Sequence, residues 1–80
     1  MYDIKATVTK ASETDVKLAG DWPTDCLQAP GSIGSMEILR KLIPGEVFET
    51  FGGHTQHLEI YHAGNALNLK VGDDVIVRCN

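Results

Sequence analysis

The chain contains few of the residues that usually carry recognisable chemistry. Cysteine occurs twice and proline three times, and aromatic residues make up 6% of the 80 residues. Cys26 and Cys79 stand far apart and form no Cys-x-x-Cys pair, which excludes the short spacings of zinc and redox motifs. In a reducing compartment the simplest interpretation is two free thiols, and a bridge between them does not follow from the sequence.

Long apolar runs and an excess of positive charge are also missing. No stretch approaches the ~18 apolar residues of a membrane span, and residues 1–5 lack the charged and apolar regions of a secretory signal. We therefore expect a cytoplasmic protein without membrane contact. Lys and Arg number 7 against 11 Asp and Glu, and the formal charge of −4 works against non-specific binding to nucleic acid or anionic lipid.

The remaining composition is typical of a folded protein, with 42% hydrophobic and 22% charged residues. Eighty residues predict a single domain over 1–80, near the lower size limit for folding without metal or disulfide support. We find no internal repeat, linker or low-complexity tract.

Alternating apolar and polar residues predict most of the strands. Residues 2–9 alternate cleanly, and the alternation resumes at Val16 after a turn, so we expect a hairpin from Tyr2 to about Gly20. Residues 45–51 and 54–62 flank Gly52-Gly53 and predict a second hairpin. Residues 67–79 hold two short alternations around a Gly-Asp-Asp turn, which is typical of a strand pair at the rim of a small β-barrel.

One short helix is predicted between these hairpins. Ser35 offers an oxygen as N-cap for a helix beginning at Met36, Ile38 and Leu42 lie on its apolar stripe, and Pro44 prevents its continuation. The predicted fold is therefore mainly β (β-rich α+β), a small antiparallel β-barrel or coiled sheet of SH3-like or OB-like size with one short helix. The core is expected to contain Ile4, Ala6, Val8, Val16, Leu18, Ile38, Leu39, Leu42, Val47, Leu58, Ile60, Leu69, Val75 and Val77.

The segment 20–35 is predicted to be a long loop, because it is rich in proline and glycine and shows no periodicity. Loops of this length in small domains are often functional. The segment contains the only tryptophan, Trp22, which we interpret first as a lid over the core. If exposed, Trp22 would instead form an aromatic binding wall with Tyr61 or Tyr2.

The histidines and Cys26 are the candidates for chemistry. In a strand, His57 shares a face with Glu59 and Tyr61 but not with His62, so strand geometry argues against a metal site, and none is predicted. Cys26 with a histidine and Asp21 or Asp25 supplies the residue types of a nucleophilic site. No motif surrounds Cys26, however, so no catalytic residue is assigned.

The first functional hypothesis is a non-enzymatic binding or interaction module that presents the 20–35 loop and the His-rich hairpin. Its partner would be an unidentified small molecule or protein, with no cofactor, and an exposed sheet edge makes a homodimer plausible. The alternatives are a nucleic-acid-binding protein that uses its lysines, and, less favoured, a small Cys/His-dependent enzyme. The predicted contact residues are Trp22, Asp25, Cys26, His54, His57 and Tyr61.

Overall fold

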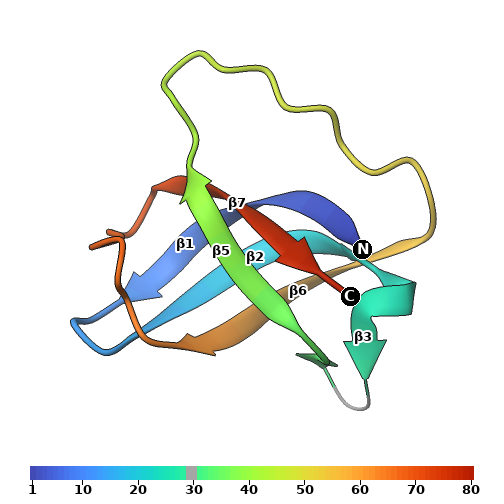
Figure 1. The fold of residues 1–80 in the computed structure, drawn as a ribbon, viewed down its shortest axis with the longest axis horizontal. Coiled ribbons are helices and arrows are strands. Elements are labelled where there is room, and N and C mark those ends of the chain that lie inside the picture. The colour runs from blue at the N-terminus through green and yellow to red at the C-terminus, as the bar shows by residue number, and fades with distance from the viewer. Residues whose placement is uncertain (29–30) are drawn as a thin grey trace.

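The computed structural model describes residues 1–28 and 31–80, and most of these lie in strands. The main sheet contains β1 (Tyr2–Ala11), β2 (Asp15–Pro23), β5 (Met36–Lys41), β6 (Thr55–Ala63) and β7 (Asp74–Cys79). Its order is β5-β7-β1-β2-β6, and every neighbouring pair is antiparallel. Figure 1 shows how strongly this sheet is twisted. The prediction of a small, mainly β, antiparallel domain is confirmed.

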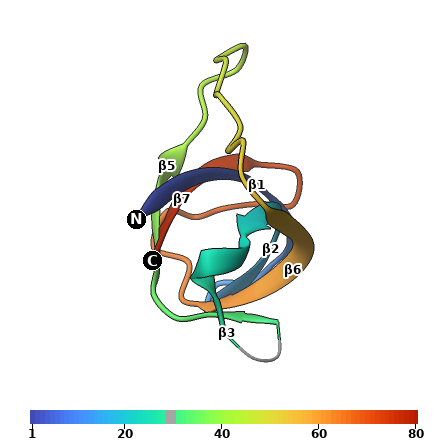
Figure 2. The same ribbon diagram turned by 90° about the vertical axis from the view of Figure 1, so that its right-hand side faces the viewer.

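The sheet is coiled but does not close on itself within residues 1–28 and 31–80. Strands β5 and β6 end the strand order, and no pairing joins them. In Figure 2 the sheet curls around one side of the molecule, while the 3-10 turn η1 (Thr24–Cys26) lies on the concave side. The coiled-sheet form of the prediction therefore applies, and β5 and β6 are edges.

The first hairpin forms as predicted, and its second strand is longer than expected. Val8 lies opposite Leu18 and Ala6 opposite Gly20, with a register shift between Val8 and Lys10. Strand β2 then continues through Trp22 and Pro23 because β6 supplies partners for its other edge.

The prediction of a structureless 20–35 loop is wrong over most of its length. After β2 come η1, then β3 (Leu27–Gln28) and β4 (Ser32–Ile33), which pair as a small separate sheet. Part of this predicted loop, Ala29 and Pro30, lies outside the described residues. Pro23 stands where β2 meets η1, and Gly31 has a positive φ of 71° just before β4, so these two residues mark changes of direction between short paired segments.

The predicted helix at 36–43 is a strand. Met36–Lys41 forms β5 and pairs with β7, which places Ile38 opposite Val77. A two-turn helix is marginal by itself, and pairing with β7 supplies a whole ladder of backbone hydrogen bonds instead. Helical structure in the described residues is limited to η1.

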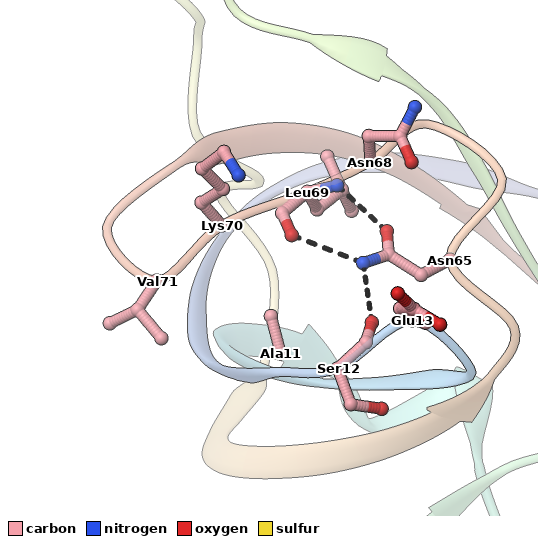
Figure 3. A pocket seen from close by; sticks show the side chains of 8 residues that line it. All are labelled: Ala11, Ser12, Glu13, Asn65, Asn68, Leu69, Lys70 and Val71. Atoms are coloured by element: carbon pink, nitrogen blue, oxygen red, sulfur yellow. Dashed lines mark hydrogen bonds between the residues drawn. The ribbon is translucent and has the colours of Figure 1, made fainter.

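Two other predicted strands do not form. Residues 45–51 contain no strand, and β6 pairs with β2 over its whole length instead of forming a local hairpin. Residues 67–73 form turns before β7, where Asn68 and Gly72 adopt positive φ values of 54° and 94°. The Asn65 side chain holds this segment, donating to Ser12 O at 2.8 Å and accepting from the Leu69 N–H at 2.7 Å (Figure 3).

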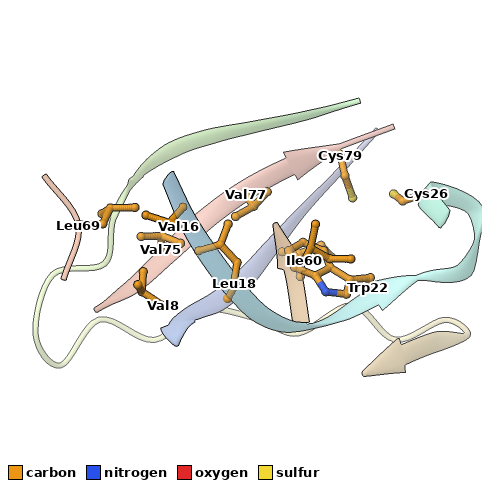
Figure 4. Close-up of a cluster of buried hydrophobic side chains, with 12 residues drawn as sticks. Val8, Val16, Leu18, Trp22, Cys26, Ile60, Leu69, Val75, Val77 and Cys79 are labelled. Atoms are coloured by element: carbon orange, nitrogen blue, oxygen red, sulfur yellow. The ribbon is translucent and has the colours of Figure 1, made fainter. Parts of the chain in front are cut away.

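The core lies between the concave face of the sheet and the segments that cross it. Trp22 is completely buried in it, and Figure 4 shows its ring beside Ile60. Val47, expected in the core, is 94% exposed. Leu39 and Leu42 are partly exposed, and Ile38 and Leu58 are partly buried against the core. The other predicted core residues are buried: Ile4, Ala6, Val8, Val16, Leu18, Ile60, Leu69, Val75 and Val77.

Across the described part of the chain, no helix has the length and apolar character needed to cross a membrane.

Candidate functional site

The six predicted contact residues separate into a buried pair and an exposed group. Trp22 and Cys26 are buried, with 0% and 1% exposure. The other residues, Asp25, His54, His57 and Tyr61, are exposed and lie on η1 and on or next to β6.

Trp22 is a core residue with a satisfied polar group. Its Nε1–H donates to the Leu58 carbonyl oxygen at 2.9 Å, as a buried indole requires. Gly20 leaves space for the ring, since a Cβ there would lie 3.2 Å from the Trp22 Cζ2 atom. The interpretation of Trp22 as a lid over the core is confirmed, and Trp22 and Tyr61 form no aromatic wall.

Asp25 is held by the first strand rather than left open for a ligand. The Tyr2 hydroxyl donates to Asp25 Oδ2 at 2.9 Å, and this hydrogen bond raises the pKa of Tyr2. The Tyr2 ring also meets Phe51 edge to face, with 4.9 Å between the ring centroids. Phe51 was expected only as the end of a strand over residues 45–51, which does not form. Its contact with Tyr2 joins residues far apart in the sequence, so no local pattern predicts it.

The exposed face of β6 combines His57, Glu59 and Tyr61. His57 Nδ1 lies 2.7 Å from Asp21 Oδ1 on the neighbouring strand β2, and both side chains are well exposed. Glu59 accepts a hydrogen bond from the Thr9 hydroxyl and lies 3.8 Å from Lys17 Nζ. Tyr61 is 59% exposed. The shared face of these three residues, expected from strand alternation, is present.

The backbone of β6 has a regular pattern that identifies its free groups. Just beyond the two ends of the β2–β6 pair, Thr24 N–H donates to His54 O at 3.0 Å and Gly64 N–H donates to Thr14 O at 2.6 Å. Both bonds fit the register of the pair, so even-numbered residues form its hydrogen-bonded positions. The odd-numbered residues therefore direct their N–H and C=O groups away from β2: Thr55, His57, Glu59, Tyr61 and Ala63.

These outward groups have no strand partner within the described residues. Strand β4 lies near β6 but pairs only with β3. The free edge and the exposed side chains belong to the same residues of β6. We define the candidate binding surface as this edge together with the side chains of His57, Glu59 and Tyr61.

The remaining histidines do not extend this surface into a metal centre. His62 lies on the face of β6 opposite to His57, next to Ile60, and His54 is fixed through its carbonyl oxygen to η1. In residues 1–28 and 31–80, no group of three or more His, Cys, Asp or Glu side chains is placed to hold a metal ion.

The environment of Cys26 gives little support for nucleophilic catalysis. Its neighbour in the core is Cys79, and burial together with the Cys26 thiol raises the pKa of Cys79 to about 12. A nucleophilic cysteine requires the thiolate and an adjacent base. Cys26 is 1% exposed, and the group beside it is a second thiol rather than a base.

Several of the cations required by a nucleic-acid surface are already paired with carboxylates. Arg40 forms a two-pronged contact with Glu46, with Nη2 to Oε2 at 2.7 Å. Lys41 Nζ lies 3.5 Å from Asp73, and Lys17 neighbours Glu59. Each pairing weakens the field that would attract phosphates, so the structure adds no support to this alternative.

No family model matches the chain, and no match was found among the curated proteins or the solved structures.

Proposed function

We propose that the protein is a non-enzymatic interaction module that docks an extended strand along the free edge of β6. The observation that supports this proposal is the nine-residue length of β6 combined with the outward direction of its odd-numbered backbone groups. An unpaired edge of this kind is a template for strand addition, in which backbone hydrogen bonds supply affinity and alternate side chains supply specificity.

The side chains of the candidate binding surface suit a protein partner. Tyrosine is enriched where proteins meet, because its ring supplies area and its hydroxyl supplies a hydrogen bond. Tyr61 lies on β6 with 59% of its side chain exposed, so its ring and hydroxyl are accessible to a partner. The Nδ1 atom of His57 is bound to Asp21, which leaves Nε2 available to a strand placed beside β6.

The partner that we propose is a second copy of the chain, with the two β6 strands antiparallel. If the odd-numbered residues pair, Glu59 can lie opposite Glu59, Tyr61 or His57 of the second copy. The first arrangement opposes like charges, which is unfavourable. The third places an imidazole opposite a carboxylate, and two-fold symmetry repeats this contact. We therefore propose the register that pairs His57 with Glu59.

Sedimentation velocity over a concentration series tests this proposal with two matched variants. His57→Pro removes an outward N–H while it leaves the β2–β6 ladder intact, whereas His57→Ala removes only the side chain. We expect the wild-type protein to dimerise, His57→Ala to dimerise several-fold more weakly, and His57→Pro to stay monomeric. Circular dichroism verifies that both variants are folded.

Two results would contradict the proposal. If the wild-type protein stays monomeric at about 1 mM, its free energy of dimerisation is weaker than about −4 kcal/mol. Such an affinity is too low for a dedicated interaction surface. A folded His57→Pro variant that dimerises as well as the wild type would place the contact elsewhere.

A further inference from the structure

The two cysteines of the chain meet in the core although they are distant in sequence. Cys26 lies on η1 and Cys79 on β7, and both belong to the same buried cluster, at 1% and 0% exposure. Figure 4 shows the two side chains directed toward each other at one end of this cluster. The sequence contains no third cysteine that would compete for either thiol.

The two cysteines sit on elements of different rigidity. Cys79 is paired on both sides, with Tyr2 on β1 and with Met36 on β5. Cys26 ends a three-residue turn that is held by a few contacts, among them Gly34 N–H donating to Cys26 O at 3.3 Å. A disulfide needs a sulfur separation of about 2.05 Å and a defined torsion. The backbone of η1 can shift to bring the Cys26 sulfur to this distance, because η1 is not paired as a strand in the main sheet as Cys79 is.

We propose that Cys26 and Cys79 form an intramolecular disulfide when the protein meets a small-molecule disulfide oxidant. In the first step, the thiolate of one cysteine attacks the oxidant RSSR, forms a mixed disulfide and releases one RSH. In the second step, the other cysteine attacks the protein sulfur of this mixed disulfide, forms the Cys26–Cys79 bond and releases the second RSH. Two protein thiols are oxidised, and one oxidant disulfide is reduced to two thiols.

The reduced and bridged forms are expected to exchange slowly. Burial holds Cys79 as a neutral thiol, with its pKa raised to about 12, and only a thiolate attacks a disulfide. Formation of the bridge therefore requires opening of η1, which exposes Cys26 and admits the oxidant. Once formed, the bridge is shielded in the same core, so a reductant also reaches it only through opening of the turn.

The bridge would connect the first and last thirds of the chain. It closes a loop of residues 26–79, and cross-linking a loop of that size changes the folding equilibrium constant by roughly a thousand-fold in the chain-entropy model. For a domain of this size, such a change raises Tm by more than about 10 °C. The inference is independent of strand docking at β6.

The experiment incubates the folded wild-type protein without denaturant in buffers of reduced and oxidised glutathione at graded ratios. Acid quenching, alkylation and intact-mass analysis then count free thiols, and peptide mapping locates any bridge. We expect a monomer that loses two hydrogens, a peptide linking Cys26 to Cys79, and a Tm above that of the reduced protein. Cys26→Ala and Cys79→Ala are expected to give only a glutathione adduct on the remaining cysteine.

Three results would overturn the inference. One is a wild-type protein that accumulates glutathione adducts or intermolecular disulfides without a Cys26–Cys79 peptide. Another is a bridge that forms only in denaturant, which would show that opening of η1 in the folded protein gives the two cysteines no route to the bridge. The last is a bridged protein with a lower Tm than the reduced one. None of these readouts requires the alanine variants to fold.

Discussion

At the scale of single residues, the burial of Trp22 shows that the start of segment 20–35 belongs to the core rather than to an exposed loop. A lone tryptophan beside proline in a sequence without periodicity has the composition of a binding loop. Its ring is instead fully buried and its Nε1–H is bound to Leu58 O, so it fixes the end of β2 against β6. The residues that remain exposed beside it, Asp21 and His57, belong to the sheet surface.

The Arg40–Glu46 pair leads to a pH prediction at this scale. Hydrogen bonds from Arg40 and from the Ile43 N–H lower the pKa of Glu46 from 4.5 to about 2. Because the folded pKa lies below the unfolded one, the stabilising contribution is present above about pH 4.5 and is lost as pH falls toward 2. We expect NMR titration of the Glu46 carboxyl to show a midpoint near 2, and Arg40→Met to raise it.

A matched variant distinguishes this pair from general surface charge. Lys10→Met removes a cation of β1 that does not line the pocket beside Glu46, and it should leave the Glu46 midpoint unchanged. A Glu46 midpoint at its ordinary value in the wild type would show that the two-pronged contact is absent in solution.

At the scale of elements, the absence of a side chain at Gly20 lets the Trp22 ring pack closely against the backbone of β2. A Cβ at Gly20 would lie 3.2 Å from the Trp22 ring and 3.4 Å from the Ala6 Cβ. Gly20→Ala is therefore expected to destabilise the fold by about 1–3 kcal/mol through overpacking. Urea unfolding monitored by tryptophan fluorescence measures this change.

Gly52→Ala serves as the control for this substitution. No atom lies within 4 Å of the position that its Cβ would take. We expect a change of less than about 1 kcal/mol, with a sign that favours folding, because alanine restricts the unfolded chain. Equal losses of stability in the two variants would contradict the packing of Trp22 against Gly20.

The elements differ in how far their sequence predicts them. Strands β1 and β2 follow from alternation, because one face of each is buried. Strand β7 buries consecutive residues on both faces, Val75, Ile76 and Val77, so its sequence predicts a strand through a short run of β-branched residues. Strand β5 follows from neither pattern, since a register shift between Ile38 and Arg40 interrupts the alternation, and the apolar spacing then fits a helix. Its identity depends on pairing with β7, which local sequence does not encode.

The candidate binding surface was predictable only in part. The common face of His57, Glu59 and Tyr61 follows from strand period alone. The contact of His57 with Asp21 joins residues on different strands, and the free edge of β6 depends on the order of the whole sheet. Neither can be read from a local pattern, because both result from long-range pairing.

At the scale of the whole molecule, the open strand order connects the fold to the proposed function. In a closed sheet every strand would have hydrogen-bonded neighbours on both sides. The order β5-β7-β1-β2-β6 instead leaves the N–H and C=O groups on one side of the nine-residue strand β6 without a strand partner in the described residues. The same order places Cys79 on β7 next to the turn that carries Cys26, so the open edge of β6 and the pair of neighbouring thiols both result from the topology of the sheet.

Amide hydrogen exchange along β6, measured by NMR at low and high protein concentration, tests the central claim most directly. At low concentration we predict slow exchange at the even-numbered residues, which face β2, and fast exchange at His57, Glu59 and Tyr61. At high concentration these three amides should become protected as a second β6 strand pairs with them. Slow exchange at all positions in dilute protein would show that the edge is already covered, and fast exchange of the odd-numbered amides at every concentration would show that no strand docks there.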